Sequence, residues 1–177
     1  MNKPFWPYPG SRWWKFDFHT HTPTSEDYGK GPQPAQLKRR TPKEWLLDYM
    51  RAGIDCLAVT DHNSGAWIDP LKSALEELES EKPEGFRPIY LFPGVEITVN
   101  GGVHVLAILN PSCTSSDVDS LLGAVGFNGT KGSSDVVTTK SFVEVVEAIE
   151  RIGGIAIPAH VDGPNGLFTG FQGTTLA

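Results

Sequence analysis

The chain has 177 residues, of which 39% are hydrophobic and 20% are charged, and its formal net charge is −6. This length and apolar content allow one hydrophobic core but are small for two, so we predict a single domain over residues 1–177. The negative charge argues against a generally basic surface of the kind that holds nucleic acid through many phosphate contacts.

The N-terminal residues and the cysteines predict the cellular location. The first twenty residues contain no unbroken apolar run, so we expect neither a signal peptide nor a membrane span. Residues 1–13, rich in proline and aromatic residues, are predicted to form an N-terminal arm. The cysteines Cys56 and Cys113 show no CxxC spacing, which argues against a thiolate metal site. We therefore expect a cytoplasmic protein.

The first half of the chain alternates between predicted strands and helices. Residues 14–21 alternate in polarity, which predicts a short strand with one apolar face and one polar face. After a polar loop, Thr41 and Glu44 form a capping box, and the helix that they begin is expected to end at Gly53 with positive φ. Residues 56–60 predict a second strand, and residues 67–81 predict a second helix.

The second half continues this pattern. Residues 89–96 predict a strand, and the turn at 100–102 followed by an apolar run to 109 predicts a hairpin. A capping box at 141–144 predicts a helix to about 152, and residues 155–158 predict a further strand. The Gly/Ser/Thr-rich stretch 123–139 lacks the spacing of a nucleotide-binding P-loop. The alternation favours a mostly parallel α/β fold, either open or closed into a barrel.

All five histidines lie at or near the ends of predicted strands, which is where a barrel enzyme holds its working groups. The period of two along a strand directs His19 and His21 to the same side, close enough to share one metal ion. The others are His62, His104 and His160. One histidine in an apolar strand is more often a core residue, but the group together favours metal ligation.

Three carboxylates accompany the histidines. Glu96 ends a strongly apolar strand, where a buried charge is costly unless it is paired or bound to a metal ion. Asp61 follows the second strand and is expected to orient a neighbouring side chain, although it could also cap a helix. After the first strand, Glu26 is expected to reach the same cavity, with Asp27 as the alternative.

The basic residues cluster in the predicted polar loop. Lys38, Arg39 and Arg40 are consecutive, with Lys30 and Lys43 nearby. Such a run is typical of a solvated loop, and the alternative is a contact with a substrate phosphate.

Five phrases of the sequence, taken in order, resemble the PHP family, named for polymerase and histidinol phosphatase. They are Phe-Asp-Phe-His-Thr-His-Thr-Pro-Thr-Ser-Glu-Asp, Val-Thr-Asp-His-Asn, Pro-Gly-Val-Glu-Ile, the strand of His104, and Ile-Pro-Ala-His. The similarity spans residues 16–162. The Trp-rich start and the helix after Thr41 most resemble the N-terminal PHP domain of TrlF-type PHP–ATPase proteins.

The resemblance implies a distorted (β/α)7 barrel that binds up to three divalent metal ions, zinc or manganese, with iron as an alternative. By motif position, His19, His21 and Glu96 would hold the first ion. Glu96, His104 and His160 would hold the second, and Glu26 with His62 the third.

The implied activity is hydrolysis of a phosphoester in a small molecule or nucleic acid by a metal-activated hydroxide. His19, His21, Asp61 and Glu96 would be the catalytic residues. The implied alternative is a non-catalytic or regulatory metal-binding module attached to an ATPase. An amidohydrolase-type barrel also begins with His-x-His, but the Thr-Asp-His phrase and the position of Glu96 argue against it.

The sequence departs from the family pattern at its end. Family members close their site with a late Asp-x-His, and residues 161–177 do not supply one. We therefore expect a barrel that is incomplete at its C-terminal end, and an open sheet edge that favours self-association.

Overall fold

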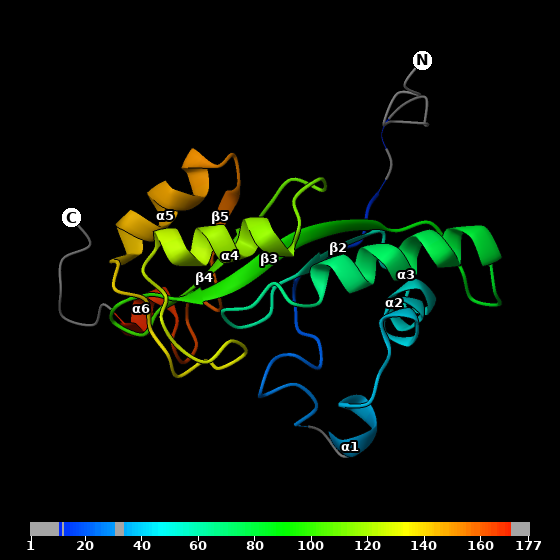
Figure 1. Cartoon of the computed structure of the whole chain (residues 1–177), viewed down its shortest axis with the longest axis horizontal. Helices are drawn as coiled ribbons and strands as arrows, with labels where there is room; N and C mark the ends of the chain where they lie inside the picture. Colours follow the sequence, from blue (N-terminus) through cyan, green and yellow to red (C-terminus); the bar gives the residue numbers. More distant parts are fainter. Residues whose placement is uncertain (1–10, 12, 31–33, 171–177) are drawn as a thin grey trace.

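The computed structural model describes residues 11, 13–30 and 34–170, so most of the predicted arm at 1–13 lies outside the described residues. Five strands form one sheet in chain order, and the sheet curls into a half-barrel (Figure 1). The strands are β1 (Phe16–Thr20), β2 (Cys56–Val59), β3 (Tyr90–Thr98), β4 (His104–Ile108) and β5 (Ile155–Pro158).

The sheet is mixed rather than mostly parallel. β1, β2 and β3 pair in parallel, whereas β4 is antiparallel to both β3 and β5. The predicted hairpin over 97–109 is confirmed as the β3–β4 pair, in which Glu96 lies opposite Leu106 and Thr98 opposite His104. The hairpin returns the chain directly, without a helical crossover, and this makes half of the strand pairs antiparallel.

Four helices of ten or more residues accompany the sheet: α2 (Pro42–Arg51), α3 (Ile68–Glu81), α4 (Ser115–Ala124) and α5 (Phe142–Arg151). Two single turns, α1 (Pro34–Leu37) and α6 (Leu167–Gly170), complete the described elements. The predicted capping boxes of α2 and α5 are both present, and Gly53 has the expected positive φ of 78°.

Helix α4 was not predicted from the sequence, although its local signal is of the same kind. Thr114 and Asp117 form a capping box, and Val118, Leu121 and Leu122 are buried on one stripe of the helix. Within the described residues, no helix has the length and apolar character needed to cross a bilayer.

The helices cover one face of the sheet and leave the other face to the barrel interior. α2 and α3 pack over the β2 side of the sheet, and α4 and α5 pack over the β4 and β5 side (Figure 1). On the opposite face, Phe18, Phe92 and Leu106 belong to a small apolar cluster. Glu96 lies on the same face of β3 as Phe92, because side chains alternate with a period of two. The interior face therefore carries the candidate site.

Candidate metal centre

The carboxylate of Glu96 is the centre of the site. Its side chain is fully buried, and imidazole nitrogens from all five histidines surround it. The distances to Oε2 are 3.1 Å from His19 Nε2, 3.4 Å from His21 Nε2 and 3.1 Å from His62 Nδ1, and those to Oε1 are 2.8 Å from His104 Nδ1 and 3.3 Å from His160 Nε2.

Strand direction explains how residues so far apart in the chain converge. The parallel strands β1, β2 and β3 end at one edge of the sheet, which brings His21, His62 and Glu96 together. His104 begins β4 rather than ending it, and the antiparallel hairpin turns this first residue back to the same edge. β1 also changes register between Asp17 and Thr20, so it is not a simple two-faced strand.

His160 reaches the site through an unusual backbone conformation. Its φ is 27°, in the left-handed region that residues with a Cβ rarely adopt. The carbonyl oxygen of His160 accepts a hydrogen bond from Gly163 N–H at 2.7 Å, and a Cβ at Gly166 would collide with the same oxygen. This turn after β5 directs the imidazole back to Glu96, and such strain is typical of functional positions.

Asp27, rather than Glu26, faces the histidines. Asp27 Oδ2 lies 3.3 Å from His62 Nε2, whereas Glu26 is exposed and does not line the cavity. The backbone N–H of Glu26 donates to the carbonyl oxygen of Gly132 at 2.9 Å, which fixes the course of the loop at this point. The sequence placed both carboxylates after the same strand and could not tell which one points inward.

The ligand atoms fall into three groups in which all atoms lie within 4.8 Å of one another: His19, His21 and Glu96; His21, Asp27 and His62; His62, Glu96 and His104. Imidazole nitrogen and carboxylate oxygen together are the donor set of zinc, manganese and iron sites. His160 is outside these groups but contacts Glu96 Oε1.

Buried polar atoms without hydrogen-bond partners support this interpretation. Among the described residues these atoms include Asp27 Oδ1, Glu96 Oε2 and His104 Nε2. His62 Nδ1 also lacks a hydrogen bond, because its 3.1 Å contact with Glu96 Oε2 has the distance of an ion pair but not the geometry of a hydrogen bond. Unsatisfied buried polar atoms are costly, so their concentration in one place fits a polynuclear metal site.

Burial and the contacts between Glu96 and the imidazoles set the charges of the site. Burial alone would raise the pKa of Glu96, but the hydrogen bond from His104 and the close imidazole of His19 bring it well below its usual range. The contact with the Glu96 carboxylate raises the pKa of His19, whereas burial lowers the pKa of His21. Glu96 is therefore ionised, and His21 favours the neutral form that binds metal ions.

Asp61 does not line the cavity but contacts the residues next to the ligands. It is fully buried and accepts hydrogen bonds from Thr22 N and Thr22 Oγ1, both at 2.6 Å, and from Ser25 Oγ at 2.7 Å. Burial is the main influence and raises the pKa of Asp61, while these hydrogen bonds act in the opposite direction.

Ser25 connects Asp61 to His21 by hydrogen bonds. Its hydroxyl donates to Asp61, so it accepts from His62 N–H and from His21 Nδ1, each at 3.1 Å. His21 Nδ1 therefore carries a proton, which leaves the lone pair of Nε2 directed at Glu96 Oε2 and available to a metal ion.

The loop over residues 125–141 braces the ligand segments. Gly132 N–H donates to the carbonyl oxygen of His62 at 2.8 Å, and Gly132 O accepts from Glu26 N–H. The side-chain amide of Asn63 donates to the carbonyl oxygens of Ser133 and Val136 at 3.0 and 3.2 Å. This segment, residues 125–141, contains Ser134, which lines the cavity.

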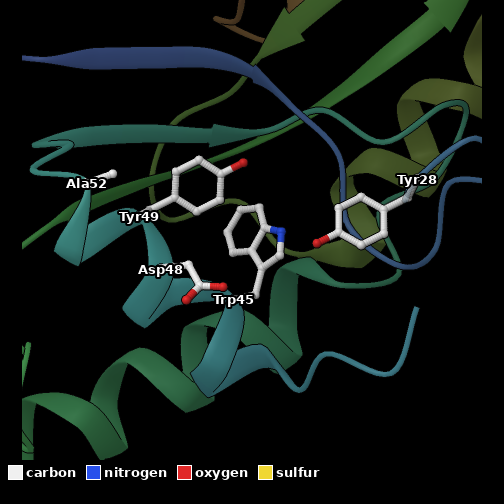
Figure 2. Close-up of a pocket in the computed structure, with 5 residues that line it drawn as sticks. All are labelled: Tyr28, Trp45, Asp48, Tyr49 and Ala52. Atoms are coloured by element: carbon white, nitrogen blue, oxygen red, sulfur yellow. The ribbon is translucent and has the colours of Figure 1, made fainter. Parts of the chain in front are cut away.

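The histidine cavity has a volume of about 310 Å³. A second hollow of about 230 Å³ lies between α2 and the loop after β1, and Figure 2 shows its aromatic lining. The indole N–H of Trp45 in that lining donates to the carbonyl oxygen of His21 at 3.1 Å, so α2 also supports the first ligand segment. The second hollow is lined by Tyr28, Trp45, Asp48, Tyr49 and Ala52.

No family model and no curated protein sequence matches the chain. Among solved structures, a candidate metal-dependent phosphoesterase from Bifidobacterium adolescentis is similar with a TM-score of 0.51 and 20% identity, over 84% of this chain and 67% of that one. Endonuclease Q, in complex with a 27-mer duplex carrying an abasic lesion at the active site, is similar with a TM-score of 0.56 and 18% identity. That similarity covers 87% of this chain and 37% of the endonuclease.

A third similar structure, an amidohydrolase from Chromobacterium violaceum, has a TM-score of 0.48 at 20% identity, which is too low to bear on the fold. At identities of 18% and 20%, the first two similarities establish the fold alone. Over most of its length, the chain has the mixed α/β fold of these two proteins.

Proposed function

We propose that the chain carries the centre of a metal-dependent phosphoesterase, with up to three divalent ions, zinc or manganese. The observation that carries the proposal is the convergence of five imidazoles on the buried carboxylate of Glu96, with unsatisfied ligand atoms among them. Structural cores avoid this arrangement, because each unsatisfied buried atom is destabilising.

The proposed ligand sets follow the resemblance, with one change. His19, His21 and Glu96 hold the first ion, and Glu96, His104 and His160 hold the second. Asp27 replaces Glu26 beside His62 at the third ion, since Asp27 faces the cavity. Ser25 and Asp61 are positioning residues, because they touch His21 and its loop rather than the cavity.

When bound, divalent ions would lower the pKa of a water molecule and neutralise charge on the phosphoryl oxygens. The protein supplies an open side for the substrate. His19 and His160 have side chains that are 33% and 34% exposed, whereas His62 and His104 are nearly buried. Substrate therefore approaches from the side of His19 and His160.

Two substrate classes are compatible with this centre, a phosphorylated small molecule and a nucleic acid. The fold of the Bifidobacterium protein supports phosphoester hydrolysis in general, and that of Endonuclease Q supports a nucleic acid substrate. The resemblance to PHP–ATPase proteins adds an attached ATPase domain as a proposed partner.

The test combines metal content with hydrolysis. Protein loaded with Mn²⁺ or Zn²⁺ is expected to hold two or three ions per chain and to release p-nitrophenol from its phosphate mono- or diester. The double variant His19→Ala, His21→Ala is expected to lose at least one ion and the activity. Bound metal without turnover of either ester, or turnover that survives the double substitution, would overturn the proposal.

A further inference from the structure

Among the described residues, one lysine and no arginine line the cavity of the metal centre. Lys30 lines it together with the histidines, Asp27 and Glu96. We propose that the Lys30 ammonium binds the phosphoryl group of the substrate and that this substrate is a phosphate monoester. The inference rests on the proposed function and extends it to the substrate.

Most other cations of the described chain have partners. Arg40 pairs with Asp48 at 2.9 Å, and Lys43 pairs with Glu77 at 2.7 Å. Lys38, although close in sequence to Lys30, donates to the carbonyl oxygen of Ser25 at 2.6 Å and so braces the ligand loop. Further cations bound to carboxylates are Arg51, Arg87, Lys131 and Lys140.

Lys30 differs from these cations in its position. Its exposed ammonium has no hydrogen-bond or ion-pair partner within residues 11, 13–30 and 34–170, a property that it shares with Lys15, Arg39, Lys82 and Arg151. Of these five side chains, Lys30 is the one that lines the metal cavity. An unpaired ammonium beside acidic ligands is suited to an anion that arrives with the substrate, because its three N–H donors match phosphoryl oxygens.

The number of charges favours a monoester. An extended nucleic acid backbone is held by several cations, each neutralising one phosphate, whereas this cavity offers one ammonium beside the metal ligands. A monoester carries close to two negative charges at neutral pH and a diester carries one. The charge of Lys30 therefore stabilises a bound monoester more than a bound diester.

The experiment measures phosphate binding separately from metal binding. Wild type, Lys30→Gln, Lys30→Arg and Lys82→Gln are loaded with Mn²⁺ and titrated with inorganic phosphate by calorimetry. Lys82 follows the last residue of α3 and does not line the cavity, so Lys82→Gln makes the same change in net charge outside it. We expect Lys30→Gln to weaken phosphate binding about tenfold, as loss of a charged hydrogen bond does, with unchanged metal content. Lys30→Arg should retain most of the affinity, and Lys82→Gln should match wild type.

Three substrates then identify which kind of phosphate ester the site accepts. In Lys30→Gln, the KM of the monoester p-nitrophenyl phosphate is expected to rise by more than the KM of the diester bis(p-nitrophenyl) phosphate. A 5′-phosphorylated oligonucleotide, tested as a third substrate, distinguishes a monoester at a nucleic acid end from a small-molecule monoester. Equal phosphate affinity in wild type and Lys30→Gln would overturn the role of Lys30, and a larger effect on the diester would overturn the monoester assignment. If metal-loaded wild type neither bound phosphate nor hydrolysed any ester, the proposed function itself would fall.

Discussion

The hydroxyl of Ser25 joins three parts of the site, since it contacts Asp61, His21 and the backbone of His62. Ser25→Ala removes the acceptor that holds the proton on His21 Nδ1. We expect metal affinity to fall about tenfold, the lower end of the effect known for such supporting groups. Titration against a competing chelator measures this affinity. Ser120→Ala, which removes a hydroxyl bonded within α4, is the control, and equal affinity in the two variants would contradict the role of Ser25.

The loop after β1 allows a direct test of the ligand set. Asp27→Ala is expected to lower the metal content by one ion per chain, because Asp27 contacts His62. The adjacent Glu26→Ala is expected to leave the content unchanged, since Glu26 is exposed. Elemental analysis of both variants after dialysis measures the content. A loss of metal in Glu26→Ala alone would restore the assignment made by motif position.

At the scale of elements, the first turn of α5 should make stability depend on pH. Hydrogen bonds from the Ser141 backbone, Lys140 and the Ser141 hydroxyl lower the pKa of Glu144 to about 2. Because the folded pKa lies below the ordinary 4.5, the stabilisation is present above about pH 4.5 and is lost as the pH falls toward 2.

The Glu144→Gln substitution removes this dependence. We expect the variant to be less stable than wild type at pH 7 and the difference to shrink at pH 3, as measured by urea denaturation at both values. A difference that stays constant between the two values would show that the ionised carboxylate does not stabilise the cap.

The segment 125–141 is a second element with a testable role. Gly132 has a φ of 91°, and a Cβ there would collide with the carbonyl oxygen of Thr24. Gly132→Ala is expected to cost about 1–2 kcal/mol through the left-handed backbone alone, and to weaken metal binding because His62 and Glu26 lose their brace. Gly123→Ala is the control, since a Cβ at Gly123 meets nothing within 4 Å. Chemical denaturation and metal titration of both variants measure the two effects.

At the scale of the whole molecule, the half-barrel has two edge strands among its described elements, β1 and β5. Each edge carries an exposed apolar side chain, Phe16 at 56% and Ile155 at 63% exposure. Such edges pair readily with other chains, so we expect the 177-residue chain to self-associate with rising concentration. Sedimentation velocity measures this.

Lysine substitutions locate the contact. Phe16→Lys and Ile155→Lys should shift the chain toward the monomer, because a charge on an edge strand opposes pairing. Val143→Lys, on α5 with the same 63% exposure as Ile155, should have no effect. A wild-type chain that stays monomeric at high concentration would contradict the expectation.

The sequence by itself determined those features that depend on near neighbours. The capping boxes at Thr41 and Ser141 and the turn at Gly53 are local, and the structure has them as predicted. The position of the histidines and Glu96 near strand ends was also readable, because periodicity assigns strands and strand ends meet at one edge of a sheet. Two details differ, since β3 continues past Glu96 to Thr98 and His104 begins its strand.

The tertiary structure alone decided which side chains face the cavity. Asp27 rather than Glu26 points inward, because Gly132, far along the chain, holds the backbone of Glu26. Lys30 lines the cavity while Lys38 is bound to the carbonyl oxygen of Ser25, although both belong to one basic loop. These choices depend on contacts between residues distant in sequence, and local propensity contains no information about such contacts.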